Sequence, residues 1–506
     1  MFSFLQRRIA LVIVALCYSV ALASSARAGS HEFRIKFPDT VRSAPFTGRV
    51  YLFFTKGKNQ EPRMGPNWFN PEPMLALDVE NWKPNEPLAV GAATGDRLIA
   101  TPKPLAELDL KGYQVQAVAR FNPYERVVGN GPGNGYSAVA EVAETTTAEA
   151  PQELTIDKHV AENPFPENRW YKLLSVHSKL LSDFHQREVA LRGSILLPAS
   201  YYDQPERRYP VIIEVPGFGG THVGRRSTEP IAEKNEGGVE FIRITLDPSC
   251  PLGHHVFADS ANNGPVGQAL VSEWIPELDR TYRTVSASTA RFVTGHSSGG
   301  WSSLWLQVAY PDVFGGTWST APDPVDFRNF QRIDMYRTGE NMYRDAAGAR
   351  RPLARMGEKV VLWYDDFDHT EEALGFGGQL HSFEAVFSPR GADGKPRRAW
   401  NRNTGAVDTE VAQAWEKYDI RLVLERNWSE LGPKLAGKLH VFQGDLDTFY
   451  LDGATRLLKA SLAKLNSDAV VEMVPEKTHF NLITPELAQR IRSEMVATYL
   501  KHHGAK

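Results

Sequence analysis

The sequence predicts an α/β fold built on a mostly parallel sheet with helices on both faces. From about residue 170 onward, short β-branched and aromatic runs recur, with helical patterning between several of them. Strands that alternate with helices form parallel sheets, and the helices cover both faces. The runs are 211–215, 241–246, 291–294, 439–442 and 469–474, and the helical segments include 268–278 and 454–465.

The first 28 residues predict a signal peptide rather than part of the fold. Arg7 and Arg8 precede an apolar run, 9–23, which is shorter than the ~20 residues that a membrane span needs. Small residues in Ala26-Arg27-Ala28 suit a cleavage site before Gly29. We therefore expect export to the periplasm or the extracellular space, and no membrane segment after cleavage. A retained anchor is the alternative.

The net charge gives information about partners, and the cysteine content about disulfides. The net charge is −3, and loss of residues 1–28, with three arginines and no acid, makes it −6. This balance gives no support to nucleic acid or an anionic membrane as a partner. Cys17 lies in the predicted signal, so Cys250 is left alone and no intramolecular disulfide can form. Stability must come from a packed core.

The chain divides into regions of different texture. Residues 29–144 contain short β-prone runs such as 49–54 separated by Gly, Pro and Asn, which predicts a small β-sandwich domain. Residues 145–169 predict a polar linker. Within the α/β region, 170–500, residues 327–428 interrupt the rhythm of strands and helices. An insertion of this length is too long for a plain loop, and we expect a cap over the active site.

The sequence GHSSG at residues 295–299 predicts a nucleophile, Ser297. The pattern G-x-S-x-G places a serine on a strained turn between a strand and a helix, where flanking glycines let the backbone pack. The run 291–294 precedes it directly and a helix-like stretch, 301–310, follows, which is the required context. A Gly/Ser loop without chemistry is the alternative.

A nucleophilic serine needs a base and an acid. In this fold the three residues follow one another along the chain as serine, then acid, then histidine. His479 comes after the last predicted strand and before the final helix, which predicts the base. Asp447, in the loop GDLDTFY, is the predicted acid ahead of Asp445. Asp323 and Asp326 are outside candidates, because they follow an earlier strand.

Two backbone donors are needed for the oxyanion of a tetrahedral intermediate. The N–H of Ser298 is one candidate. Phe218, in the turn PGFGG after the run 211–215, is the other, with Gly219 second. The alternative for this glycine-rich segment is a turn without chemistry.

Loops after the run 241–246 lie on the carboxyl side of the predicted sheet, where ligands bind. They carry His254, His255 and Asn263, which are candidate substrate contacts. A plain hydrogen-bonded loop is equally compatible with these residues.

No cofactor or metal is expected. The sequence has no phosphate loop, dinucleotide fingerprint or zinc-protease motif. The acidic stretch DDFDHTEE at 365–372 lacks the spacing of a metal-binding loop, and we interpret it as a solvated acidic face in preference to a cation site.

Taken together, these motifs resemble the bacterial putative-esterase family of α/β-hydrolases, which includes feruloyl-esterase-like, esterase-D-like and enterochelin-esterase-like enzymes. The residues that carry the resemblance are TGHSSGG (294–300), PGFGG, GDLDTFY, EWIPEL (273–278) and TYRT (281–284). It covers roughly residues 170–500. It implies the α/β-hydrolase fold and a Ser297–Asp447–His479 triad. The β-rich N-terminal region and the long insertion depart from simple members, so the substrate stays open.

The residues and the resemblance lead to the expectation of a serine esterase that acts through an acyl-enzyme. Its substrate would be a small-molecule or polysaccharide-linked ester. The same groups could serve a serine peptidase or an acyltransferase. A catalytically inert protein that binds a carbohydrate or a partner is an alternative from a different class.

Overall fold

The computed structural model describes residues 31–224, 227–230 and 237–504, which form two compact units. Of these residues, 31–122 and 128–161 form the first unit, and 123–127 with the described residues of 162–504 form the second. The predicted signal peptide, 1–28, lies outside the described residues. Within the described part of the chain, no helix is both long and apolar enough to cross a membrane.

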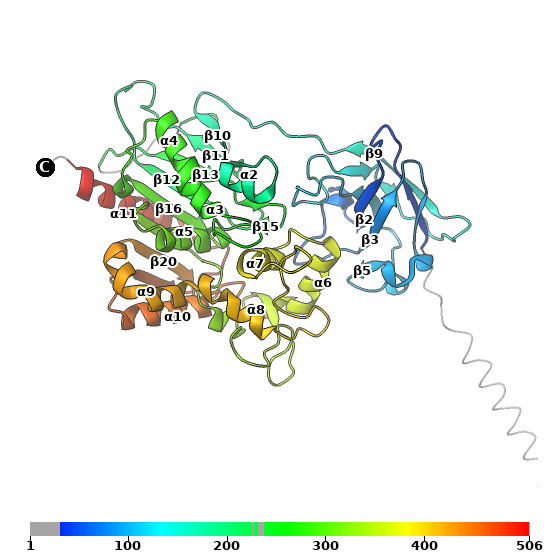
Figure 1. The fold of residues 1–506 in the computed structure, drawn as a ribbon. Coiled ribbons are helices and arrows are strands. Elements are labelled where there is room, and N and C mark those ends of the chain that lie inside the picture. The colour runs from blue at the N-terminus through cyan, green and yellow to red at the C-terminus, as the bar shows by residue number, and fades with distance from the viewer. Residues whose placement is uncertain (1–30, 225–226, 231–236, 505–506) are drawn as a thin grey trace, which may run out of the picture. The chain divides into compact units, whose positions relative to one another are not determined.

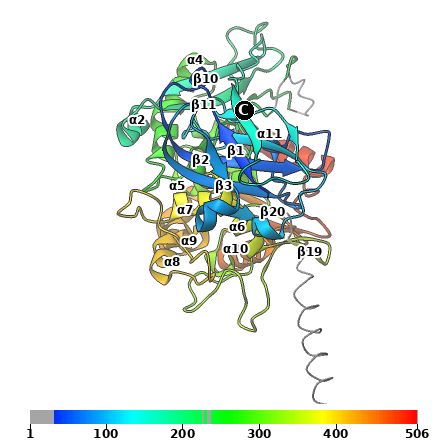
Figure 2. The same ribbon diagram turned by 90° about the vertical axis from the view of Figure 1, so that its right-hand side faces the viewer.

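The first unit is a β domain, of which Figure 2 labels β1, β2 and β3. Its described strands form one nine-stranded sheet of order β4-β1-β9-β7-β6-β2-β3-β5, with β8 on β6. The strands are β1 Phe33–Lys36, β2 Phe46–Thr55, β3 Met74–Trp82, β4 Leu88–Val90, β5 Ile99–Thr101, β6 Gln114–Ala119, β7 Gly135–Ser137, β8 Ala140–Glu141 and β9 Gln152–His159. β1 and β2 are far apart in this order, yet the rings of Phe33 and Phe54 lie 5.8 Å apart. The sheet therefore curls around one apolar core rather than forming two separate sheets.

The predicted linker at 145–169 differs from the structure. Strand β9 lies inside it, pairing in parallel with β1 and antiparallel with β7. Leu154 and Ile156 are buried in the core of the first unit, while neighbouring Glu153 and Asp157 are exposed. Polar residues on the outer face of the strand gave it the composition of a linker.

The second unit is built on an eight-stranded sheet of order β10-β11-β13-β12-β16-β17-β20-β21 (Figure 1). The strands are β10 Tyr171–His177, β11 Ala190–Leu196, β12 Val211–Val215, β13 Ile242–Leu246, β16 Arg291–His296, β17 Gly316–Thr320, β20 Leu439–Gly444 and β21 Val470–Val474. All pairings from β13 to β21 are parallel, whereas β10 and β11 are antiparallel. The predicted α/β-hydrolase architecture is confirmed.

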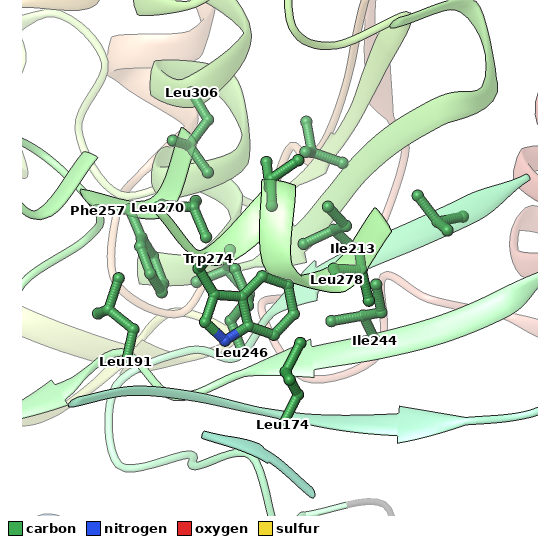
Figure 3. Packing of buried hydrophobic residues seen from close by; sticks show 14 of the residues in the cluster. Leu174, Leu191, Ile213, Ile244, Leu246, Phe257, Leu270, Trp274, Leu278 and Leu306 are labelled. Carbon is green, nitrogen blue, oxygen red and sulfur yellow. The ribbon is translucent and has the colours of Figure 1, made fainter. Parts of the chain in front are cut away.

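Helices cover both faces of this sheet. They are α2 Lys179–His185, α3 Val266–Ala269, a π-helical turn Leu270–Trp274, α4 Ile275–Thr281, α5 Ser298–Ala309, α10 Asp452–Lys464 and α11 Pro485–His503. Ile213 on β12 packs in a cluster with Trp274, whereas its neighbour Ile212 packs in a second cluster with Met495 of α11. Figure 3 shows the first cluster around the Trp274 indole. Alternate residues of a strand point to opposite faces, so both faces are buried.

The order of the strands locates a crevice. The chain passes from β12 to β13 on one side, then returns to β16 on the other side of β12. Loops after β12 and β16 therefore diverge at the carboxyl edge of the sheet, which is where ligands bind in open α/β sheets.

The predicted insertion is a largely helical segment between β17 and β20. Its elements are β18 Pro352–Met356, β19 Lys359–Trp363, α6 Tyr364–Leu374, α7 Gln379–Phe387 and α8 Thr409–Ala414, before α9 Ile420–Leu435. It packs on α5 through aromatic side chains: the rings of Trp301 and Phe387 lie 5.2 Å apart, and those of Trp305 and Tyr418 lie 5.8 Å apart. α9 spans the predicted boundary at residue 428.

Candidate active site

Ser297 stands on a sharp turn between β16 and α5. Its backbone has φ of 60° and ψ of −127°, a conformation that ordinary residues rarely adopt. The flanking glycines make this turn possible, because a Cβ on Gly295 would lie 2.1 Å from the carbonyl oxygen of Gly299, and one on Gly299 would lie 1.9 Å from that of Val215. The predicted strand–turn–helix context is present, and Ser297 lies at the diverging loops of the crevice.

His479 and Asp447 meet in the loops after β21 and β20. The Nδ1 atom of His479 lies 3.0 Å from Oδ2 of Asp447, and both side chains are buried. Nδ1–H donates to the carboxylate, which leaves Nε2 as the acceptor of the neutral ring. The His479 ring lies 4.6 Å from that of His296, the residue before Ser297. The structure thus brings the predicted base next to the turn that carries the predicted nucleophile.

Asp447 is held in place by three further donors. Nε2 of Gln443 donates to Oδ2 at 3.0 Å, and the N–H groups of Phe449 and Leu451 donate to Oδ1 at 2.8 and 3.4 Å. These contacts fix the carboxylate while it faces His479.

The other candidate acids are engaged elsewhere. Asp445 accepts the N–H of Glu476 at 2.7 Å. Asp326 binds Arg328 and Arg421. Neither carboxylate has a contact with a histidine in the described part of the chain.

Asp323 forms a different buried contact beside the site. Its Oδ2 accepts the hydroxyl proton of Ser298 at 2.5 Å, and Nε2 of Gln379 lies 3.3 Å away. Burial raises the pKa of Asp323 to about 6, although the hydrogen bond from Ser298 acts in the opposite direction. Gln379 belongs to the insertion, and its Nε2 also donates to Oγ of Ser298 at 3.1 Å. Sequence reasoning missed Gln379, because no motif marks it.

The predicted oxyanion donors lie on opposite sides of the crevice. Ser298 is the first residue of α5, where backbone N–H groups have no partner within the helix. The Phe218 loop follows β12, and Gly219 turns it with φ of 87°. A Cβ on Gly217 would lie 3.9 Å from Oγ of Ser297, so this loop approaches the hydroxyl closely.

The loops predicted to contact substrate have distinct roles. His254 is buried, its Nε2 bonds the carbonyl oxygen of Pro216 at 2.9 Å, and its Nδ1 accepts the N–H of Val256. Both ring nitrogens are therefore used inside the protein, which leaves none for a substrate. Burial lowers the pKa of His254 to about 4, so the ring is neutral. It holds the start of the Phe218 loop. By contrast, His255 and Asn263 line a cavity.

The sequence predicted a solvated acidic face at residues 365–372, and this prediction is wrong. The stretch forms α6, and Asp368 and Glu371 are buried. Asp368, Glu372 and His381 could geometrically hold a metal ion. Arg402 and Arg398 already neutralise this group, since Arg402 lies within 3.3 Å of both carboxylates and Arg398 within 2.7 Å of Glu372. A cation would have to displace these guanidinium groups.

Residues 187–422 match the model of the family described as "Putative esterase". The matched segment contains Ser297 and the Phe218 loop, and it ends before Asp447 and His479. No curated protein matches the chain in sequence.

Several solved structures are similar to the chain at low identity. An S-formylglutathione hydrolase from Agrobacterium tumefaciens is 13% identical over 66% of this chain and 97% of its own, with a TM-score of 0.38. A ferulic acid esterase from Anaeromyces mucronatus is 13% identical over 68% and 94%, with a TM-score of 0.33. Dipeptidyl peptidase 4 from Porphyromonas gingivalis is 11% identical over 85% and 48%, with a TM-score of 0.37. At these values, the three structures say nothing about the substrate of this chain.

Proposed function

We propose that this chain is a serine hydrolase that cleaves a carboxylic ester through an acyl-enzyme. The observation that carries the proposal is the 3.0 Å contact between buried Asp447 and His479, next to the strained turn of Ser297. The match of residues 187–422 to an esterase family supports the choice of an ester as substrate.

The reaction follows from the roles of these groups. Nε2 of His479 takes the proton of the Ser297 hydroxyl as Oγ attacks the ester carbonyl. Asp447 keeps the imidazole in the correct tautomer and stabilises the imidazolium. The N–H groups of Ser298 and Phe218 hold the oxyanion, and the dipole at the N-terminus of α5 favours its charge. His479 then protonates the leaving alcohol. Water, activated by His479, releases the acid and frees Ser297.

Replacement of the nucleophile tests the proposal. Ser297→Ala should abolish turnover of 4-nitrophenyl esters and labelling by a fluorophosphonate probe, while the fold stays intact by circular dichroism. Ser303→Ala is the matched control, because Ser303 lies in the same helix, is buried, and bonds the carbonyl of Gly300. Esterase activity that persists in Ser297→Ala would refute the assignment. Cleavage of peptides but not esters would favour a peptidase.

We further propose that the chain is exported. The support is the sequence of residues 1–28, with its two leading arginines, short apolar run and small residues before Gly29. Mass spectrometry of the protein from a secreting host should give an N-terminus at Gly29. An intact N-terminus on protein recovered from the cytoplasm would contradict export.

A further inference from the structure

A cavity of about 590 Å³ lies beside the candidate active site, within the second unit. It opens where β11 begins and the neighbouring β13 ends, since these strands are antiparallel. The N–H of Asp247, just after β13, donates to the carbonyl of Arg192 at 2.9 Å, and both residues line the cavity. The cavity is therefore at the same edge of the sheet as Ser297.

The cavity adjoins the loop that carries Phe218. Thr221, in that loop, is part of its lining. In the strand order, β13 lies two strand spacings from β16, and β11 lies three. At about 4.8 Å per spacing, this places the cavity roughly 10–15 Å from Ser297. This separation is within the length of an extended ester substrate.

Positive charge predominates in this lining. Five cationic side chains line the cavity against three carboxylates. The cations are Arg126, Arg187, Arg192, Arg390 and Lys395, and the carboxylates are Glu125, Glu188 and Asp247.

Two of these carboxylates, Asp247 and Glu188, each lie against a histidine. The carboxylate of Asp247 lies 2.7 Å from His222, and that of Glu188 lies 2.7 Å from His177. Among the described residues, by contrast, Arg187, Arg192, Arg390 and Lys395 have no carboxylate within ion-pair distance. The lining thus has an excess of positive formal charge.

Two other polar side chains of the lining, His185 and Asn263, fit this excess of positive charge. The pKa of the His185 imidazole is lowered mainly by burial, and the charges of Arg187 and Arg390 lower it further. Asn263 is buried in the lining, and its Nδ2 has no hydrogen-bond partner among the described residues. A buried donor without a partner is unusual, and an anionic oxygen would satisfy it.

We propose that this cavity binds an anionic group of the ester substrate, such as a carboxylate, phosphate or sulfate, while the ester bond lies at Ser297. The inference rests on the proposed esterase function and names the class of its substrate. Guanidinium groups suit such anions because they donate paired hydrogen bonds to two oxygens of one group.

Matched charged and neutral esters test the proposal. 4-Nitrophenyl hydrogen sebacate and 4-nitrophenyl methyl sebacate differ only in a remote carboxylate on the acyl side. An acetate ester of a long ω-hydroxy acid and its methyl ester give the same pair on the alcohol side. In one of the two pairs, kcat/KM should favour the charged member about tenfold. Sulfate and phosphate should inhibit turnover of that charged member alone, and the more effective ion identifies the preferred headgroup.

Variants of the cavity should remove the preference without affecting the chemistry. Arg192→Gln and Arg390→Gln should each reduce it severalfold, and the double variant should bring it to about one, with turnover of the neutral ester unchanged. Arg492→Gln is the control, because Arg492 is exposed on α11, does not line the cavity and loses the same charge. The proposal is overturned if neither pair shows the preference, or if the double variant retains it.

A binding measurement separates this proposal from the esterase proposal. Ser297→Ala protein cannot turn over substrate by the proposed mechanism, yet it should bind monomethyl sebacate in a calorimeter. The same protein with Arg192→Gln and Arg390→Gln should bind it at least tenfold more weakly. Normal hydrolysis of neutral esters without such binding would sink the anion site alone. Binding without hydrolysis by the unmodified protein would sink the esterase assignment alone.

Discussion

At the scale of single residues, the proposed chemistry depends on which carboxylate orients His479. Asp447 and Asp445 are two positions apart in one loop, but only Asp447 contacts the imidazole. Asp447→Asn should lower kcat by about 10³- to 10⁴-fold, because an amide favours the wrong imidazole tautomer. Asp445→Asn, the same chemical change, should leave kcat within a few fold. Steady-state kinetics on a neutral 4-nitrophenyl ester decides, and equal effects of both changes would contradict the assignment.

Asp323 predicts a pH dependence of stability. Its pKa is raised from the usual 3.8 to about 6 by burial, so the native state holds this proton more tightly than the unfolded state does. The resulting stabilisation is complete below about pH 3.8 and is lost as the pH rises through about 6, for a total of about 3 kcal/mol.

Asp323→Asn removes this titration. The free energy of unfolding of the variant, relative to the unchanged protein, should rise by about 1 kcal/mol between pH 5 and pH 8. Urea denaturation of both proteins at the two pH values measures the difference. Other titrating groups, such as buried Glu371, contribute equally to both proteins and cancel. A difference that stays constant with pH would show that Asp323 is not protonated in the native state near pH 5.

Residue roles could be predicted only where a motif or the chain order marks them. Ser297 lies in a five-residue pattern, and His479 and Asp447 stand at fixed places after particular strands. His254 was expected to contact substrate, because its loop lies at the binding edge of the sheet. Its two internal hydrogen bonds depend on the paths of separate loops, which no local pattern encodes.

At the scale of elements, Glu371 links the two helices of the insertion. Its buried carboxylate, at the end of α6, accepts the N–H groups of Gln379, Leu380 and His381 at the start of α7. These donors have no partners within α7, so the side chain acts as the N-terminal cap.

Loss of this cap should destabilise the protein. Glu371→Ala should lower the free energy of unfolding by about 2 kcal/mol, because it leaves buried donors unpaired. Glu371→Gln keeps an acceptor and should cost less. Glu410→Ala, at an exposed position of the same insertion, should stay within about 0.5 kcal/mol. Urea unfolding curves compare the three, and a Glu371→Ala protein as stable as Glu410→Ala would argue against the cap.

The sequence indicated elements well where periodicity is local. The predicted run 211–215 coincides with β12, and 268–278 lies within the continuous helical segment of α3 to α4. β9 was missed, because its partner β1 lies more than a hundred positions away and its outer face is polar. The acidic stretch of α6 was misread for a similar reason. Arg350, Arg398 and Arg402, which neutralise it, are distant in sequence.

At the scale of the whole molecule, the chain has separate cores in its two units. One cluster contains residues of the β domain, such as Leu75, and the other clusters contain residues of the hydrolase-like sheet, such as Ile213. Each of these clusters lies wholly within one unit. Units with separate cores can unfold independently unless a large apolar interface couples them.

We therefore expect two calorimetric transitions. Leu75→Ala should lower the midpoint of one transition only, and Ile213→Ala that of the other, because each fully buried side chain leaves a cavity worth about 2–5 kcal/mol in its own core. Esterase activity assayed on heating should be lost with the transition that Ile213→Ala shifts, since Ser297, Asp447 and His479 all belong to that unit. A single transition that both substitutions shift equally would mean that the units unfold as one cooperative body, and the β domain would then contribute directly to the stability of the site.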